Sequence, residues 1–269
     1  MVIKWNSGSK YDKINDLFSG NILSYFPAYR YEQPGYLNNP YKVKLKFKKE
    51  NSVVGELPNP IESISSLDNI SNWLLDIILD MSLYPTDVDV IKIQSTINSI
   101  ISRILISKLG EQVRLGIGPR RDGATRIAVT KQNGQIIYPS IFNMSSGESG
   151  LIALFCEIVH QADNINKLNN ISGIVLIDEI DKNLHIKLQK EVLPELFKLF
   201  PMVQFIVSTH SPFLNMGLGE TIPDITKIID LDNNGIITTP VQNEQYLEVY
   251  NMMLNENARY AEKYNTLKE

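Results

Sequence analysis

The sequence has few of the features that would place it in a specialised class of protein. Its 269 residues contain one cysteine, Cys156, which excludes an internal disulfide framework. No apolar run approaches the ~18 residues of a membrane helix. The start, MVIKWNSGSKYDK, lacks the apolar region of a signal peptide. The net charge is −4, so no overall basicity points to nucleic acid. We therefore expect an ordinary globular protein of a reducing, cytoplasmic compartment, with no membrane partner.

The N-terminal part predicts two strands, at 21–28 and 41–49. In YKVKLKFKK, lysines alternate with Val43, Leu45 and Phe47, which gives the second strand one wet face and one dry face. A lysine-rich face can follow phosphates. We favour the alternative, a solvated edge strand whose charges prevent aggregation.

Two helices and a small antiparallel sheet are expected next. Residues 66–81 and 86–109 each carry an apolar stripe at helical spacing, and Gly110 is placed to end the second helix. The stretches QVRLGIG, TRIAVT and QIIYPS then predict strands joined by turns at PRRDG and QNG. Arg120 and Arg121, in the first of these turns, would suit a nucleic acid or a protein partner, but two arginines on a turn are weak evidence for either.

From residue 145 helices and strands alternate. The strands GIVLI and VQFIVS have no polar face and are separated by helices, which predicts a parallel sheet covered on both sides. The stretch TKIIDLDNNGIITTP predicts a hairpin around Asn234 and Gly235. The tail from Asn243 is polar and helix-prone, with an apolar side that suits a partner. The fold class is therefore α/β.

Polar residues follow both of these strands. Asp178 and Glu179 come directly after the first, and residues 208–211, STHS, come directly after the second. In open parallel sheets ligands bind beyond the carboxyl ends of the strands. The helix that opens at SSGESG can direct its first amides to the same edge. Three clusters are therefore expected to converge on one crevice.

The two acids fit the chemistry of phosphoryl transfer. Mg²⁺ takes oxygen ligands, often one or two carboxylates with phosphates and waters. Asp178 can hold such an ion while Glu179 polarises an attacking water. For the Asp-Glu dipeptide alone, we favour the alternative that it simply begins an ordinary loop.

The helix start and the histidine also have two interpretations. Ser145 and Glu148 form a capping-box pattern, which accounts for much of SSGESG without a ligand. Gly147 and Gly150 lower helix stability, however, and suit a backbone that must approach phosphates. His210 by itself fits a hydrogen-bonded loop histidine better than a catalytic one.

Together, SSGE, GIVLIDEID and STHSP resemble the C-terminal half of ABC-type ATPase heads. The resemblance is closest to the stand-alone AAA ATPases related to SMC, RecF and OLD proteins, and it covers about residues 140–215. It implies a parallel-sheet, P-loop NTPase-like core with a helical insertion and a small antiparallel sheet. Upstream, YFPAYR resembles a strand of the family's N-terminal lobe.

The resemblance also implies residue roles, with ATP and Mg²⁺ as cofactors. Asp178 corresponds to the magnesium-associated acid of Walker B, Glu179 to the general base and His210 to the switch histidine that senses the γ-phosphate. Asp181 and Asn183 belong to the D-loop. The nucleotide-binding signature motif is Ser145, Ser146, Gly147 and Glu148.

The same resemblance divides the chain into four parts. Residues 1–60 would be a remnant of the N-terminal lobe strands and 61–111 the helical insertion. Residues 112–240 would form the C-terminal lobe with signature, Walker B and switch histidine, and 241–269 a helical tail.

The phosphate-binding loop of this family, G-x-x-x-x-G-K-[ST], is missing. None of the 15 glycines is followed by lysine. The chain is then the C-terminal part of a longer ATPase, the partner of a separate P-loop polypeptide, or a degenerate member. The intact acids favour the first two. Alone, the chain is expected to hydrolyse ATP poorly or not at all.

The function expected from this resemblance is an ATPase subunit or fragment, in which association of heads controls DNA processing or an anti-phage effector. Its partners would be a second copy or a P-loop-bearing ATPase, with DNA or an effector nuclease as a further partner. The alternative is a non-catalytic regulatory module that binds a partner through the signature surface and the tail. A metal-dependent nuclease would need more acids near Asp178 and Glu179 than the sequence offers.

Overall fold

A computed structural model describes the parts of the chain from which the candidate site is built. These parts are residues 20–28, 30, 67–118, 127–165, 168, 170–243 and 247–257. The chain divides into two compact units. The first extends to Asn183 and includes Leu196–Ser208, and the second contains Leu184–Glu195 and the chain from Thr209 onward. Among the described residues, no helix is both long and apolar enough to cross a membrane.

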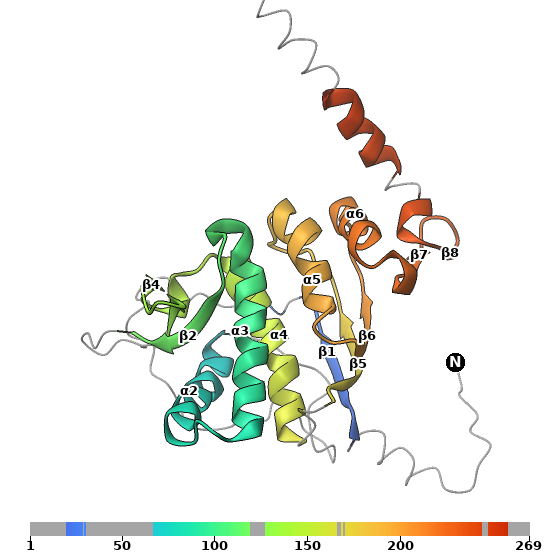
Figure 1. The fold of residues 1–269 in the computed structure, drawn as a ribbon. Coiled ribbons are helices and arrows are strands. Elements are labelled where there is room, and N and C mark those ends of the chain that lie inside the picture. Colours follow the sequence, from blue (N-terminus) through green and yellow to red (C-terminus); the bar gives the residue numbers. More distant parts are fainter. Residues whose placement is uncertain are drawn as a thin grey trace, which may run out of the picture. The chain divides into compact units, whose positions relative to one another are not determined.

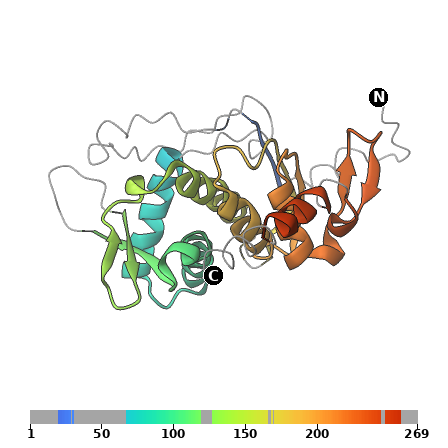
Figure 2. The same ribbon diagram turned by 90° about the horizontal axis from the view of Figure 1, so that it is seen from above.

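Three helices form one layer of the first unit. They are α2 (Leu67–Leu83), α3 (Val88–Leu109) and α4 (Ser146–Asn164), which pack against one another (Figures 1 and 2). The side chain of Asp87 caps the start of α3, and Gly110 ends it in the left-handed conformation, at φ 69°. The apolar stripe predicted for α3 is fully buried, with Ile93, Ile97, Ile100, Ile101 and Ile104 in the core. Both predicted helices are therefore confirmed.

The small antiparallel sheet is also confirmed. Its strands are β2 (Val113–Ile117), β3 (Ile127–Lys131) and β4 (Ile136–Tyr138), in the order β2-β3-β4. At the QNG turn, Gly134 has φ 86° and its amide donates to the carbonyl of Lys131. The short 3₁₀ helix η2 (Ile141–Asn143) then leads into α4.

A second, parallel sheet carries the candidate site. Its strands are β1 (Ile22–Phe26), β5 (Ser172–Ile177) and β6 (Met202–Val207), in the order β1-β5-β6. Both strand pairs are parallel, so the three carboxyl ends lie at one edge of the sheet. The expected parallel α/β core is thus present, and β1 joins it from a position far upstream in the sequence.

One face of this sheet is buried. Helix α4 packs on β1, and Phe26, Val175 and Ile177 on that face are almost inaccessible to solvent. Phe155 of α4 also meets the aromatic rings that follow along the chain, with its ring centroid 6.1 Å from that of Phe197 and 6.3 Å from that of Phe205. These contacts fix β6 and the end of α5 (Leu193–Phe197) against α4.

The opposite face is open in the described part of the chain. Ile174, Met202 and Ile206 are 39%, 58% and 49% exposed. The expectation that both faces of the sheet are covered is therefore wrong for this part of the chain. An apolar strand without a polar face can be buried on both sides, but burial also needs a covering element, and the strand's own sequence does not supply one.

The second unit contains short elements. A π-helix, η3 (Leu188–Val192), packs against α6 (Pro212–Thr221). Two 3₁₀ helices, η4 (Pro223–Ile225) and η5 (Pro240–Gln242), flank the hairpin of β7 (Ile228–Asp230) and β8 (Ile236–Thr238). The predicted Asn234-Gly235 turn is confirmed, because both residues have positive φ, 57° and 74°. Residues 247–257 are helical, as expected for the tail.

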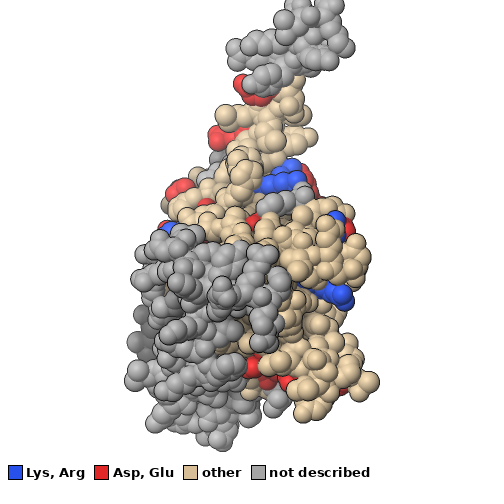
Figure 3. Space-filling model, turned by 90° about the vertical axis from the view of Figure 1, so that its left-hand side faces the viewer, with Lys and Arg blue, Asp and Glu red and all other residues tan. Residues whose placement is uncertain are grey.

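Two sequence predictions lie outside the described residues. They are the lysine-rich strand at 41–49 and the arginine turn with Arg120 and Arg121. Among the described residues in Figure 3, lysine, arginine and acidic side chains are scattered, and no extended patch of one sign covers the face shown.

Candidate active site

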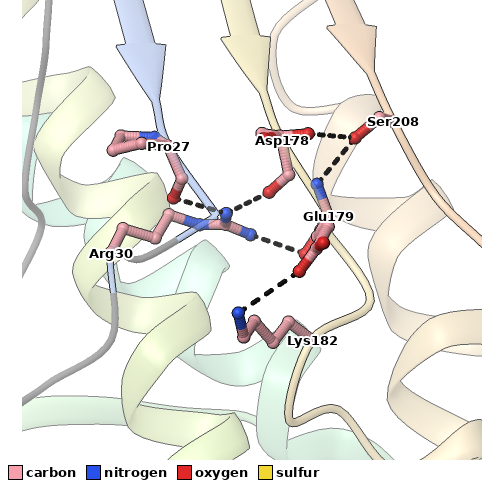
Figure 4. Close-up of polar contacts among 6 residues, drawn as sticks. All are labelled: Pro27, Arg30, Asp178, Glu179, Lys182 and Ser208. Atoms are coloured by element: carbon pink, nitrogen blue, oxygen red, sulfur yellow. Dashed lines mark hydrogen bonds and ion pairs between the residues drawn. The ribbon is translucent and has the colours of Figure 1, made fainter.

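The two predicted acids lie where β5 ends, in a turn that we call the acidic turn (residues 178–183). The amide of Asp178 donates to the carbonyl of Phe26, 2.9 Å away, in the last backbone bond between β5 and β1. On the other side, the amide of Ser208 donates to the carbonyl of Ile177, also at 2.9 Å. The acidic turn therefore starts at the carboxyl edge of the sheet, between the ends of its two neighbouring strands (Figure 4).

Ser208 binds the acidic turn from the β6 side. Its hydroxyl donates to the carboxylate of Asp178 and accepts from the amide of Glu179, 2.8 Å away. Its carbonyl accepts from the amide of Ile180 at 3.0 Å. One serine thus orients the carboxylate of Asp178 and fixes the backbone on both sides of Glu179.

Arg30 binds the acidic turn from the β1 side (Figure 4). One of its terminal nitrogens, Nη1, donates to the carbonyl of Pro27 at 3.0 Å and to the carbonyl of Asp178. The other, Nη2, donates to the carbonyl of Glu179 at 3.1 Å. Burial lowers the pKa of Arg30, and the nearby carboxylates, first that of Asp178 and then those of Glu179 and Asp181, act in the opposite direction and raise it.

The backbone of the acidic turn is unusual at Glu179. Its φ is 46°, in the left-handed region that residues other than glycine seldom adopt, and Asn183 has φ 62°. The carboxylate of Glu179 pairs with Lys182 at 3.2 Å, with both side chains about two-fifths exposed. Such an exposed pair contributes little to stability, so the carboxylate remains available. Asp181 is half-buried and Asn183 is exposed.

The signature residues form the start of α4. The hydroxyl of Ser145 accepts from the amide of Glu148, and the carboxylate of Glu148 accepts from the amide of Ser145 at 2.9 Å, which confirms the capping box. Glu148 and Gly147 are buried, whereas the side chains of Ser145 and Ser146 are exposed. Figure 1 shows α4 running from the carboxyl end of the sheet toward its other end.

Gly150 has no packing role in this structure. A β-carbon added there would meet no atom within 4 Å. The fold therefore gives no reason for glycine at this helical position, and the interpretation that a ligand requires it remains a prediction.

His210 belongs to the second unit, two positions after Ser208 along the chain. Its side chain is exposed. The next residue, Ser211, caps α6 and donates its hydroxyl to the amide oxygen of Gln189. The imidazole is thus carried on a short segment between β6 and a capped helix. Its approach to the acids stays a prediction from the sequence.

The donor set suits Mg²⁺ only together with other oxygen ligands. In the described ranges, no group of three or more His, Cys, Asp or Glu residues gathers around one point. Asp178 and Glu179 offer carboxylate oxygens at a partly exposed edge. Magnesium sites with few protein carboxylates complete their ligand shell from phosphates and water. The residues therefore fit an ion whose remaining ligands are phosphate oxygens and water.

The motifs YFPAYR and STHS contain Arg30 and Ser208 but do not by themselves indicate a role for either residue. Both contact the acidic turn mainly through backbone groups, which a motif does not reveal. The available signal was their position. Each follows closely after a strand that neighbours β5, and such positions meet at one edge of a parallel sheet.

Comparison with known proteins identifies the class. A family model described as "AAA domain, putative AbiEii toxin, Type IV TA system" matches residues 27–217, well over half of the chain. The chain therefore belongs to this family of AAA domains. The match includes the acidic turn, the signature residues, Arg30 and His210.

Individual relatives are proteins of retron and Septu systems. The chain is 37% identical over 156 residues to the retron Vc95 probable ATPase of Vibrio cholerae serotype O1 biovar El Tor, covering 56% of this chain and 27% of that protein. It is 44% identical over 77 residues to the retron Ec83 probable ATPase of Escherichia coli, covering 27% and 14%. It is 38% identical over 81 residues to the Septu protein PtuA of Bacillus mycoides (strain KBAB4), covering 30% and 11%.

These matches span about a quarter or less of each relative's length. Among solved structures, an SMC head bound to the C-terminal winged-helix domain of ScpA aligns at 24% identity, over 56% of this chain and 42% of that chain. Its TM-score is 0.32.

Proposed function

We propose that the chain provides the signature helix, the acidic turn and the switch histidine of an ATP-hydrolysing site whose P-loop comes from another segment or another chain. The observation that carries this proposal is the acidic turn itself. It places Asp178 and Glu179 at the carboxyl edge of a parallel sheet, fixed from both sides by Ser208 and Arg30. Membership of the AAA family supports a nucleotide as the ligand.

Each residue then has a role. Asp178, oriented by the Ser208 hydroxyl, would hold magnesium directly or through water. Glu179 accepts a proton from the attacking water, for which its carboxylate must leave Lys182. When bound together with ATP, Mg²⁺ would supply neutralisation of the charge on the phosphates.

The remaining roles concern the phosphates and the second head. His210 contacts the γ-phosphate, and Asp181 and Asn183 contact the opposing head through the D-loop. The phosphate-binding set is Ser145, Ser146, Gly147 and Glu148.

The biological setting follows from the relatives by analogy. Two of them are named as retron ATPases and one as a Septu protein. We infer that this chain likewise acts in a bacterial defence system, where ATP-driven association of heads controls an effector nuclease or DNA processing. The second head is another copy or a P-loop-bearing ATPase chain.

A non-catalytic interaction module is the second candidate. Apolar side chains on the hairpin of the second unit favour it, since Ile229, Leu231 and Ile237 are 60%, 83% and 67% exposed. A module of this kind would bind its partner equally well with and without nucleotide.

Nucleotide-dependent association separates the two candidates. The chain is mixed with the P-loop-bearing region of a family relative, and complex formation is measured by analytical ultracentrifugation with and without MgATP. We expect Glu179→Gln to accumulate the ATP-bound complex, because binding is intact while hydrolysis is slowed by about 100-fold or more. Glu191→Gln, an exposed acid that pairs with Lys187 as Glu179 pairs with Lys182, is the matched control. Association that is equally strong with and without MgATP would favour the interaction module.

A further inference from the structure

We propose that Arg30 is the positioning residue of the active site, and that it acts through the backbone of the acidic turn. The inference rests on the proposed function in one respect, namely that Asp178 and Glu179 are the catalytic carboxylates. It adds a residue from a distant part of the sequence, 148 positions before Asp178, to the machinery of the site.

The first argument is the set of atoms that Arg30 contacts. Its guanidinium donates to three main-chain carbonyls, those of Pro27, Asp178 and Glu179. The amide of Asp178 makes the last ladder bond from β5 to β1, so the carbonyls of Asp178 and Glu179 lie beyond the regular sheet. Beyond the last ladder bond, the hydrogen bonds of Arg30 join the end of β1 to Asp178 and Glu179.

The second argument is the conformation that these bonds hold. Glu179 has φ 46°, which costs a residue with a β-carbon free energy and persists only where surrounding contacts determine it. Two contacts do so from opposite sides, because the Ser208 hydroxyl accepts from the Glu179 amide and Arg30 donates to its carbonyl. The direction of the Glu179 side chain follows from this fixed backbone.

Hydrogen bonding to the carbonyls of two adjacent residues requires the guanidinium group of arginine. Arginine presents several N–H donors in a rigid planar fork, so two nitrogens can reach the carbonyls of adjacent residues at once. Lysine carries the same charge on one freely rotating ammonium group and cannot reproduce the fork. The cation is partly buried beside the carboxylates of Asp178, Glu179 and Asp181, which offset the cost of its burial.

A direct role in binding phosphate is the competing interpretation. The geometry opposes it, because both terminal nitrogens of Arg30 are already directed at main-chain carbonyls. An arginine that binds phosphate would direct its N–H donors away from the backbone and toward the anion. The two roles predict different kinetic behaviour, so the tests below distinguish them.

The first test measures hydrogen exchange in the full chain without nucleotide. In Arg30→Lys and Arg30→Ala we expect the amides of Glu179 and Ile180 to exchange about 10-fold faster, since the turn loses its bonds to β1. The amides of β5 should keep their protection. Arg114, an exposed arginine on β2, provides the matched controls Arg114→Lys and Arg114→Ala. Exchange that rises across the whole parallel sheet, or does not change at Glu179 in Arg30→Lys, would overturn the proposal.

The second test measures ATP hydrolysis by the assembled complex. We expect both Arg30 variants to lower kcat by about 10- to 100-fold with KM for ATP within about threefold of wild type, since positioning acts on the chemical step. Millimolar guanidinium should partly rescue Arg30→Ala, whereas methylammonium should not. A rise in KM with kcat unchanged, and near-normal activity in Arg30→Lys, would instead assign Arg30 to phosphate binding.

The two tests fail independently of each other. Hydrogen exchange needs no hydrolysis. Localised loosening of the turn, in a complex that never hydrolyses ATP, would therefore reject the proposed function and keep Arg30 as a positioning residue. Hydrolysis that depends on Glu179 but is unchanged in the Arg30 variants would keep the proposed function and reject Arg30 as a positioning residue.

Discussion

At the scale of single residues, Ser208 both stabilises the acidic turn and orients the carboxylate of Asp178. Its hydroxyl contacts a carboxylate oxygen of Asp178 and the amide of Glu179, so it orients one acid and anchors the other. A hydroxyl in this place is a better positioning group than a second charge, because it donates and accepts at once. The acids therefore have an ordered arrangement before any nucleotide binds.

Replacing this hydroxyl tests the arrangement. We expect Ser208→Ala to lower the free energy of unfolding by about 1 to 2 kcal/mol, because the amide of Glu179 and the carboxylate of Asp178 lose a partner. Urea denaturation of the chain measures it. Thr96→Ala is the control, since the Thr96 hydroxyl bonds only a carbonyl of its own helix and is exposed. Equal stability of Ser208→Ala and the wild type would contradict the hydrogen-bond assignment.

Cys156 gives a residue-scale prediction of pH dependence. Burial raises the pKa of this thiol well above its ordinary value of 9.0. Below pH 9 the thiol is neutral in both the folded and unfolded states, and its contribution to stability is complete. Above pH 9 the unfolded chain releases the proton and the folded chain does not, so the free energy of unfolding falls by up to about 1.4 kcal/mol per pH unit.

The measurement compares denaturation at pH 8 and pH 10. The loss of stability in the wild type should exceed that in Cys156→Ala by about 1.4 kcal/mol, and other groups that titrate cancel in the difference. Because Cys156 is the sole cysteine, thiol labelling of the native chain gives an independent check, and it should require unfolding. Rapid labelling of the native protein at pH 8 would contradict the burial.

At the scale of elements, the start of α4 has a structural purpose that can be separated from the ligand-binding purpose we propose for it. The capping box accounts for Ser145 and Glu148 without any ligand. It does not account for Gly150, which lies in the first turns of α4 with open space around it. If phosphates approach this helix start, glycine is needed for the complex and not for the fold.

Gly150→Ala separates these purposes. Alanine is better than glycine inside a helix, so we expect the isolated chain to gain about 0.5 to 1 kcal/mol of stability. MgATP-dependent association with a P-loop partner should nevertheless weaken. Gly217→Ala is the opposite control, because a β-carbon there would lie 2.0 Å from the carbonyl oxygen of Lys190 and should destabilise α6. A more stable Gly150→Ala with unchanged association would remove the ligand argument for this glycine.

The elements also show what the sequence predicts well. Period and capping signals placed α2, α3, the antiparallel sheet and the hairpin, because these depend on neighbours in sequence. The exposed face of the parallel sheet was not predicted. The apolar residues of β6 indicate that the strand can be buried, but they do not indicate which element covers it. The contacts of Arg30 with the acidic turn were not predicted for a related reason. Its partners are carbonyls 148 and 149 residues away, and a carbonyl has no sequence signature.

At the scale of the whole molecule, the chain offers acids, a helix start and a histidine, but no P-loop motif within its 269 residues. The curated relatives are several times longer than the segments that match. We therefore propose that ATP hydrolysis belongs to an assembly. In the proposed assembly this chain would contribute Glu179 as the general base, together with the residues that hold it in place.

Steady-state ATP hydrolysis by the purified chain tests this claim most directly. With MgATP, the chain alone should show no turnover above that of Glu179→Gln, and addition of a P-loop-bearing partner should produce turnover that Glu179→Gln abolishes. Sustained hydrolysis by the chain alone, lost in Glu179→Gln, would contradict the account.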